Sequence, residues 1–228
     1  MRTSKPRIIV TCGPSFEPID SVRCITNSST GELGVLLSEE MTAHGVEVIC
    51  LKGRLATFRD PSGASLLTYF DTNSSLLRIL EQQSMDARHR IDAVYHAAAL
   101  CDYRVAHVRN VEGEVVSAAK VPTDCGNLTL QLEPTIKLLP HIRMLFPKAW
   151  IVGWKLEHMG NPETTVQKAL QQLQIAQSDE CIINGPAFGV GFGLCNPRGL
   201  VSAWDSKVEL CRALTERLLK NTNRSSAC

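Results

Sequence analysis

The sequence lacks the long hydrophobic runs and the charge excess that mark membrane proteins and nucleic-acid-binding proteins. No apolar run approaches the length of about 20 residues that a helix needs to span a bilayer. The first apolar run, at residues 8–10, is too short for the core of a signal peptide. The formal net charge is only +1 and no long basic run is present, which argues against a general nucleic-acid binder. We therefore expect a cytoplasmic protein that binds neither membranes nor nucleic acids.

The chain also lacks C-x-x-C pairs, although it contains 9 cysteines at irregular spacings. An odd number of cysteines without a secretion signal favours free thiols over a disulfide framework. Cys50 and Cys181 lie inside apolar runs, where cysteine packs as a small hydrophobic residue. The histidines show no metal-ligand spacing either. We predict reduced, mostly buried thiols and no zinc site. The sequence pattern does not identify the ligands of any metal ion.

Length and composition fit one soluble α/β domain. A chain of 228 residues with 44% hydrophobic and 21% charged residues can bury a sizeable core. Short apolar segments alternate with amphipathic segments of helical period, and this alternation is typical of parallel βαβ units. No internal repeat or linker interrupts it. We predict a single domain over residues 1–228, with a Rossmann-like, doubly wound, mainly parallel sheet and helices on both faces.

Hydrophobic periodicity locates the predicted elements. Strands are expected at residues 8–10, 46–51, 92–98, 150–154, 180–183 and 200–204. Helices are expected at residues 33–44, 74–88, 134–146, 162–177 and 206–219. Asn161 is an N-cap followed by Pro162 at the first helical position, and Asp205 is the expected cap of the last helix. Residues 52–68 and 185–199 are expected to be loops.

Residues 103–132 break the alternation of strands and helices. Within them, residues 115–116 and 128–132 have the composition of short strands, so this segment is expected to form a β flap outside the main sheet. The C-terminal tail, residues 221–228, is polar and is expected to fray.

Residues 8–34 combine the features of an anion-binding site. A strand is followed by a loop from Gly13, and this loop ends in Asn-Ser-Ser-Thr-Gly at residues 27–31, where a helix begins. Backbone N–H groups and the positive end of a helix dipole meet at such a point, which favours phosphate or carboxylate groups. The small residues 97–99 should lie at the same edge of the sheet, because ligands sit outside the carboxyl ends of parallel strands. We expect a nucleotide or another phosphorylated substrate here.

A dinucleotide-binding site is the alternative for the same edge. The G-x-G-x-x-G fingerprint is absent after the first strand, and only Gly31 and Gly34 give a G-x-x-G. The second strand ends in Lys52 instead of the acidic residue that would bind the ribose of NAD. Lys52 or Arg54 could meet the 2′-phosphate of NADP, so an NADP-binding or non-catalytic Rossmann-like protein remains open.

Five stretches of this chain have a recognisable order and spacing. They are C-G-P-S-F-E-P-I-D-S-V-R-C-I-T-N-S-S-T-G-E-L-G at 12–34, A-A-A-L-C-D-Y-R at 97–104, A-K-V at 119–121, G-W-K-L-E at 153–157 and I-I-N at 182–184. Together they resemble phosphopantothenate–cysteine ligase, also called phosphopantothenoylcysteine synthetase. The resemblance covers about residues 7–215, and the first stretch is the most specific. The chain resembles a standalone ligase, because the flavin-containing decarboxylase half of many bacterial versions is missing.

The resemblance implies a two-step ligation. In this family the carboxylate of 4′-phosphopantothenate attacks the α-phosphate of a nucleoside triphosphate and pyrophosphate leaves. The amine of L-cysteine then displaces the nucleotide. Charge that develops on the phosphoryl group must be neutralised by Mg²⁺, lysines and backbone N–H groups. The resemblance therefore implies Mg²⁺, CTP or ATP as co-substrate, with CTP favoured, and a homodimer whose partner subunit completes the substrate site.

The resemblance also implies roles for individual residues. Asn27 would hold the acyl intermediate and assist the cysteine step, and Lys120 of the flap would close over the phosphates, so these two are the predicted catalytic residues. The predicted substrate-binding residues are Arg23, Asn27 and Ala99. The predicted nucleotide-binding residues are Gly13, Ser29, Thr30, Gly31, Ala97, Ala98, Asp102, Lys120, Trp154 and Lys168.

Several of these positions depart from the family's pattern or leave alternatives open. Lys120 stands alone where the family is often lysine-rich, Trp154 replaces the usual phenylalanine, and Gly185 replaces an aspartate. Asp102 is expected to bind ribose or to organise the metal, and Lys168 to reach the nucleotide phosphates. Each assigned residue could also have a structural role, such as a helix cap, a turn residue, a solvated lysine or a core tryptophan.

Overall fold

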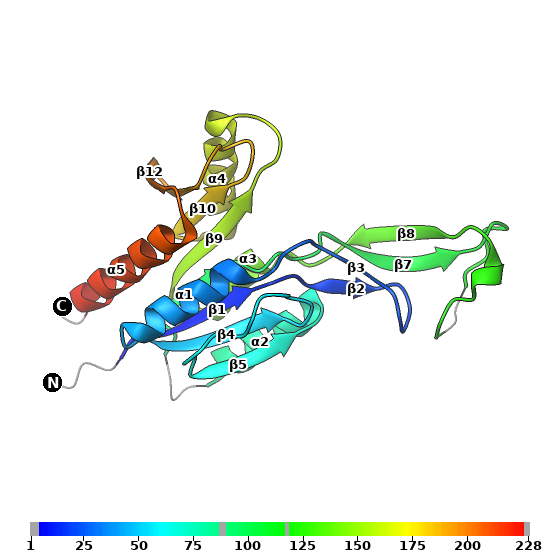
Figure 1. Cartoon of the computed structure of the whole chain (residues 1–228), viewed down its shortest axis with the longest axis horizontal. Helices are drawn as coiled ribbons and strands as arrows, with labels where there is room; N and C mark the ends of the chain where they lie inside the picture. The colour runs from blue at the N-terminus through cyan, green and yellow to red at the C-terminus, as the bar shows by residue number, and fades with distance from the viewer. Residues whose placement is uncertain (1–4, 87–89, 117–118, 226–228) are drawn as a thin grey trace.

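The computed structural model describes residues 5–86, 90–116 and 119–225. In this part of the chain an 8-stranded sheet has the order β12-β11-β10-β9-β6-β1-β4-β5 (Figure 1). Its strands are β1 (Arg7–Cys12), β4 (Glu47–Gly53), β5 (Leu66–Phe70), β6 (Ala93–His96), β9 (Trp150–Leu156), β10 (Glu180–Asn184), β11 (Phe192–Asn196) and β12 (Gly199–Trp204). The strands from β10 to β5 pair in parallel, whereas β11 and β12 are antiparallel. The predicted fold class is confirmed.

Helices cover both faces of the sheet. They are α1 (Glu32–Ala43), α2 (Asn73–Ser84), α3 (Leu138–Leu145), α4 (Pro162–Ala176) and α5 (Lys207–Ser225). Side chains alternate between the two faces of a strand: Val10 packs with α1 and α5, and Ile9 packs with α2 and α3. α4 packs on the same face as α2 and α3, against Ile183. In the described part of the chain no helix has an apolar stretch long enough to cross a bilayer.

A two-stranded arm extends beyond the carboxyl edge of the sheet (Figure 1). It pairs β7 (Tyr103–Arg109) with β8 (Thr129–Pro134) in antiparallel register. A second hairpin of β2 (Phe16–Pro18) and β3 (Cys24–Thr26) lies beside it, and the short helix η1 (Thr123–Cys125) belongs to the arm's far end. The predicted β flap is therefore present, but Val115 makes only an isolated bridge to Arg109, so the strand predicted at residues 115–116 is wrong.

Local capping signals predict one helix start correctly and another incorrectly. Asn161 caps α4, because its side chain accepts a hydrogen bond of 2.9 Å from the backbone N–H of Thr164, and Pro162 is the first helical residue. At α5 the cap is Ser206, whose hydroxyl accepts from the N–H of Glu209 at 3.2 Å, so the prediction of Asp205 is wrong. α5 continues to Ser225, so residues 221–225 are helical, and the rest of the predicted frayed tail lies outside the described residues.

Three other segments differ from the predicted elements. The loop expected at 52–68 contains the end of β4 and most of the edge strand β5, and the loop expected at 185–199 contains β11. Pro134 ends β8 instead of starting a helix, because β8 pairs with β7 up to that residue, and α3 begins only at Leu138. The end of the helix expected at 74–88 falls partly outside the described residues.

Candidate functional site

The loops that follow β1 and β6 run side by side at the carboxyl edge of the sheet. The N–H of Ala97 donates to the carbonyl of Thr11 at 3.0 Å, and the N–H of Ala99 donates to the carbonyl of Gly13 at 2.9 Å. Pro14 and Ala99 form a parallel bridge. The structure thus brings together Gly13 and the small residues 97–99, as the shared strand edge predicted.

Gly13 and Gly31 pack tightly against each other at the start of α1. We call these two glycines, together with Ser29 and Thr30, the anion cradle. Both glycines have left-handed backbone angles, with φ of 77° and 80°. A Cβ on Gly31 would lie 3.3 Å from the Cα of Gly13, and a Cβ on Gly13 would lie 2.7 Å from the Cβ of Ala56. Glycine is required at both positions, because a side chain would be strained and crowded. The N-terminus of α1 consequently opens at the edge of the sheet.

Asn27 joins the cradle to the second loop. Its Nδ2 donates to the carbonyls of Ala99 and Leu100, at 3.2 Å and 2.9 Å. An amide nitrogen has two hydrogens to donate, so these two carbonyls use both and also fix which end of the carboxamide is nitrogen. Asn27 is exposed. It therefore presents Oδ1, a hydrogen-bond acceptor, as the end available to a ligand.

Asp102 ends the second loop, and its carboxylate forms an ion pair with Lys137. Both side chains are 69% exposed. Lys137 precedes α3, and the N-terminus of α3 faces the same edge of the sheet, but sequence reasoning missed this lysine. A cavity of about 150 Å³ lies against the pair, and its lining includes His96, Ala98 and Gln172.

His96 is buried at the end of β6 and bonds to the neighbouring strand. Its Nδ1 lies 2.8 Å from the hydroxyl oxygen of Thr11. That hydroxyl accepts from the N–H of Ala98 at 3.3 Å, so its own hydrogen is available to Nδ1, which leaves the ring hydrogen on Nε2. Burial lowers the pKa of His96 to about 4. The ring is therefore neutral at pH 7 and is a candidate hydrogen-bond donor in the lining of the cavity.

The turn of the β2–β3 hairpin holds the segment that carries Lys120. Arg23 pairs with Asp20 at 2.5 Å and donates to the carbonyl of Val121 at 2.6 Å. The N–H of Val121 donates to the Asp20 carboxylate at 3.1 Å, and the N–H of Ser21 donates to the carbonyl of Ala119 at 2.8 Å. Hydrogen bonds from the backbone of Val22, and then from Arg23, hold the pKa of Asp20 well below its usual range. Arg23 is thus a link to the Lys120 segment.

The structure separates Lys120 from Asn27 within one chain. Lys120 is exposed beside the hairpin turn, whereas Asn27 follows β3 at the opposite end of the hairpin. Four residues of extended chain from Arg23 to Asn27 span about 13 Å. No contact joins the two predicted catalytic residues in the part of the chain that the structure describes.

Trp154 lines the cavity beside Asp102, whereas Lys168 is held in an ion pair away from it. Trp154 packs against the apolar cluster under α1 and α5, and its buried indole nitrogen has no hydrogen-bond partner among the described residues. The Nζ of Lys168 lies 2.5 Å from Glu157 and lowers the pKa of that carboxyl. Gly185 has φ of 106°, and a Cβ there would lie 2.5 Å from the carbonyl oxygen of Glu157. The local backbone therefore requires glycine at position 185 of this chain.

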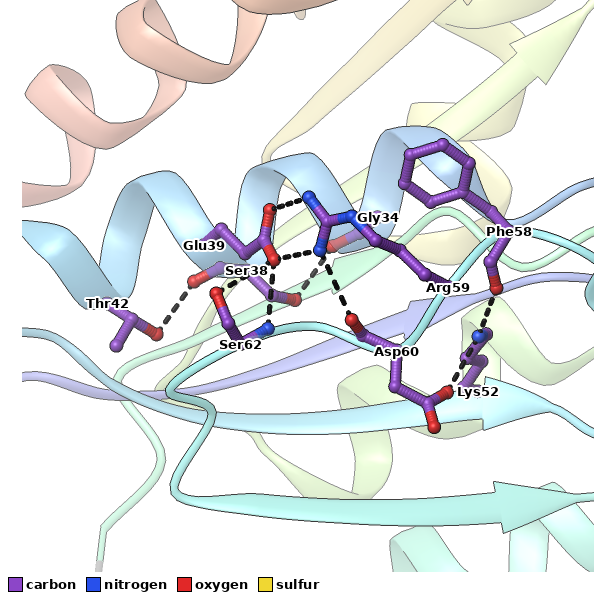
Figure 2. Close-up of polar contacts among 9 residues, drawn as sticks. All are labelled: Gly34, Ser38, Glu39, Thr42, Lys52, Phe58, Arg59, Asp60 and Ser62. Carbon is purple, nitrogen blue, oxygen red and sulfur yellow. Dashed lines mark hydrogen bonds and ion pairs between the residues drawn. The ribbon is translucent and has the colours of Figure 1, made fainter.

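Lys52, the residue considered for an NADP phosphate, is buried and paired (Figure 2). It is 3% exposed, and its Nζ donates to the carbonyl of Phe58 at 2.5 Å and to Asp60 at 2.8 Å. Arg54, beside it, pairs with Asp71 at 2.6 Å. Arg59 reaches Glu39 on α1 (Figure 2). Lys52 binds the loop that contains Phe58 and Asp60, so its ammonium group is not available to a 2′-phosphate.

The described residues contain no group of three or more His, Cys, Asp or Glu side chains that could hold a metal ion. Mg²⁺ is commonly bound through one or two carboxylates together with substrate phosphates. Asp102 is the exposed carboxylate at the edge of the sheet that fits this mode. The cysteines whose side chains the structure describes are Cys12, Cys24, Cys50, Cys101, Cys181, Cys195 and Cys211; they are free thiols, and Cys24 alone among these seven is exposed, as the sequence predicts.

Among the curated relatives of this chain are proteins named for coenzyme A biosynthesis. It is 32% identical over 185 residues to the coenzyme A biosynthesis bifunctional protein CoaBC of Thermococcus kodakarensis, with 80% of this chain and 42% of that protein covered. It is 28% identical over 183 residues to CoaBC of Bacillus subtilis, with the same shares covered. The chain therefore spans less than half the length of these relatives.

Solved structures share the fold. The DNA/pantothenate metabolism flavoprotein of Streptococcus pneumoniae superposes with a TM-score of 0.83 at 23% identity, over 95% of this chain and 99% of that one. A Cab2 variant in complex with phosphopantothenate-cysteine gives a TM-score of 0.72 at 20% identity, over 97% and 88% of the two chains. At these identities the likeness concerns the fold.

A family match covers nearly the whole chain. Residues 3–215 match the family described as the DNA/pantothenate metabolism flavoprotein C-terminal domain. The match contains the anion cradle, the 97–102 loop and the arm. It confirms the family that the five sequence stretches resemble. The chain belongs to the DNA/pantothenate metabolism flavoprotein C-terminal domain family.

Proposed function

We propose that this protein joins 4′-phosphopantothenate to L-cysteine through an acyl-nucleotide, giving 4′-phosphopantothenoylcysteine for coenzyme A biosynthesis. The observation that carries the proposal is the meeting of the anion cradle, the Asn27 carboxamide and the 97–99 loop at one sheet edge. The names of the CoaBC relatives support the pathway. The Cab2 variant, which shares the fold, is in complex with phosphopantothenate-cysteine, and this ligand combines the two parts of the proposed product.

In the activation step, the carboxylate of 4′-phosphopantothenate attacks the α-phosphorus of the nucleoside triphosphate, and the bond to pyrophosphate breaks. Backbone N–H groups at the start of α1 and the helix dipole stabilise the negative phosphate oxygens. Mg²⁺ supplies charge neutralisation when it is bound with the nucleotide, and Asp102 is its proposed protein ligand. Lys120 adds a positive charge from the arm.

We propose that Lys120 acts from the partner subunit of a homodimer. Its separation from Asn27 within one chain supports this arrangement, because an arm that extends away from its own sheet edge can reach the edge of a second copy. Arg23 would then serve the substrate side from the same hairpin, since it also holds the backbone beside Lys120.

In the transfer step, the amine of cysteine attacks the acyl carbon and the nucleotide leaves. The Oδ1 of Asn27 is the acceptor that faces a ligand, so it suits an N–H of the incoming amine. An acceptor at this point orients the nitrogen lone pair toward the acyl carbon and stabilises the positive charge that develops on nitrogen.

We propose the cavity beside Asp102 as the base subsite of the nucleotide. Its volume of about 150 Å³ is sufficient for a nucleobase, and the Nε2–H of His96 is the donor for an acceptor atom of the base. We favour CTP over ATP, because cytosine presents a carbonyl oxygen as such an acceptor and adenine does not. Trp154 and Lys168 remain proposed nucleotide contacts. Trp154 already lines this cavity, whereas Lys168 would have to leave Glu157 to reach the nucleotide.

A coupled assay for pyrophosphate tests the function. The protein is incubated with 4′-phosphopantothenate, L-cysteine, Mg²⁺ and either CTP or ATP, and we expect pyrophosphate and 4′-phosphopantothenoylcysteine in equal amounts, faster with CTP. Omitting cysteine should leave the acyl-nucleotide on the enzyme. Absence of pyrophosphate with both nucleotides would show that the proposal is wrong. Tight NADPH binding by calorimetry, without binding of CTP or ATP, would favour the dinucleotide alternative.

A further inference from the structure

Asn73, the first residue of α2, has a fully engaged side chain although sequence reasoning gave it no role. It is 1% exposed. Its Oδ1 accepts from the hydroxyl of Ser15 at 2.7 Å, and its Nδ2 donates to the carbonyl of Cys101 and to the hydroxyl of Thr135, both at 2.8 Å. One buried carboxamide therefore joins three separate segments of the chain.

Two of these segments are the points where the arm joins the rest of the chain, and we call them the feet of the arm. Cys101 comes just before Asp102 and β7, and Thr135 comes directly after β8. The feet are also bonded to each other, because the Thr135 hydroxyl donates to the carbonyl of Cys101 at 2.7 Å and the Thr135 N–H donates to the carbonyl of Asp102 at 2.9 Å. Asn73 ties this crossing point to the N-terminus of α2.

The third segment leads to Asn27. The hydroxyl of Ser15 accepts from the N–H of Cys101 at 2.8 Å, and the N–H of Ser15 donates to the carbonyl of Ala99 at 3.2 Å. The Ala99 carbonyl is one of the two that hold the Asn27 amide. The peptide groups between Ala99 and Asp102 are therefore held by Asn27 from the solvent side and by Asn73 from the core.

We propose that Asn73 is a positioning residue for the ligation: it sets the 99–102 loop, and through this loop the carboxylate of Asp102 and the carboxamide of Asn27. This inference rests on the proposed function for the roles of Asp102 and Asn27. Loss of the carboxamide leaves the carbonyl of Cys101 and the hydroxyl of Thr135 with one partner fewer, so the loop and both feet of the arm lose their common anchor.

The test variant is Asn73→Asp, which keeps the shape of the side chain, removes both donated hydrogen bonds and places a carboxylate oxygen against the carbonyl of Cys101. We expect the KM for the nucleotide to rise and kcat to fall, so that kcat/KM drops about 100-fold, as expected for a misplaced catalytic constellation. Arg143→Met is the matched control. Arg143 also ties several segments, donating to the carbonyls of Gln177 and Ala149 at 2.8 Å and 3.0 Å and pairing with Asp179 at 2.7 Å, but it does so at the opposite edge of the sheet.

The control should lower the melting temperature and leave kcat/KM near the wild-type value. If Asn73→Asp does not fold, Thr135→Val removes one hydroxyl of the same network and should shift KM and kcat in the same direction by less. Backbone amide exchange gives a readout that does not need activity: amides of residues 99–104 and 133–136 should exchange faster in Asn73→Asp and not in Arg143→Met. Unchanged exchange there, or kinetic losses that simply follow melting temperature in both variants, would overturn the inference. An inactive wild type with the expected exchange pattern would instead count against the proposed function.

Discussion

Burial of His96 makes the stability of this protein depend on pH between about 4 and 6.5. Burial lowers the pKa of His96 to about 4, whereas histidine in an unfolded chain has a pKa of about 6.5. Between these values the unfolded state binds a proton that the folded state does not, so stability falls as the pH falls. The contribution of His96 is fully present above the unfolded value and is lost as the pH falls toward 4.

The size of this effect follows from the two pKa values. Each pKa unit corresponds to about 1.4 kcal/mol, so the full contribution is about 3 kcal/mol. Integrating the difference in bound protons from pH 7 to pH 5 gives a loss of about 2 kcal/mol for the wild-type protein. Such a loss is a large part of the stability of an ordinary domain and is readily measured.

Urea unfolding of the wild type and of His96→Gln at pH 7 and pH 5 measures it. Glutamine does not titrate, and its side-chain oxygen can accept from the hydroxyl of Thr11, so the variant should lose about 2 kcal/mol less than the wild type over this interval. His158→Gln, which replaces an exposed histidine, controls for the removal of an imidazole ring and should follow the wild type. If His96→Gln and the wild type lose the same free energy of unfolding, the imidazole is charged in the folded state and the reasoning fails.

Three further substitutions test other parts of the site and core. Asn27→Asp should still form the acyl-nucleotide but slow transfer to cysteine about 100-fold, because a carboxylate cannot donate to the two carbonyls that hold the amide; equal loss of both half-reactions would contradict the assigned role. Lys120→Gln should slow the activation step, which is measured as slower pyrophosphate release. If the two residues act across the dimer, an equal mixture of re-associated Asn27→Asp and Lys120→Gln subunits should recover about a quarter of wild-type activity, because half of the dimers are mixed and each mixed dimer has one intact site. No recovery would place both residues in one subunit's site. Gly34→Ala puts a Cβ 2.2 Å from the Cβ of Cys12, so thermal unfolding should show a destabilisation of about 1–3 kcal/mol, and an unchanged melting temperature would mean that the helix start can shift freely.

Features that depend on near neighbours could be predicted from the sequence. The Asn161-Pro162 start of α4 is a local signal, and the structure has it. The adjacency of the cradle and residues 97–99 follows from a general rule, because loops after neighbouring parallel strands share an edge. Both predictions needed only periodicity and the order of the elements.

Features that depend on distant partners could not be predicted. Pro134 looks like the start of a helix until β7 is known to pair with the residues before it. Lys52 looks like a phosphate ligand until Asp60 is found to pair with it at 2.8 Å. Asn73 is one polar residue at a helix start, and only the folded chain brings Cys101 and Thr135 to its side chain. Sequence patterns describe what a residue can do, whereas these partners decide what it does.

The site has one part built on the sheet and another carried on the arm, and their attachments differ. Gly13 and Gly31 pack backbone against backbone, so the cradle has little freedom to move. Among the described residues, the arm is held where its strands leave the sheet, where β2 packs along β7, and where the β2–β3 turn holds residues 119–121. The proposed two-step ligation needs a fixed anion site for both steps and a positive charge during activation. In this proposal the anion cradle at the sheet edge meets the first need, and Lys120 on the arm meets the second.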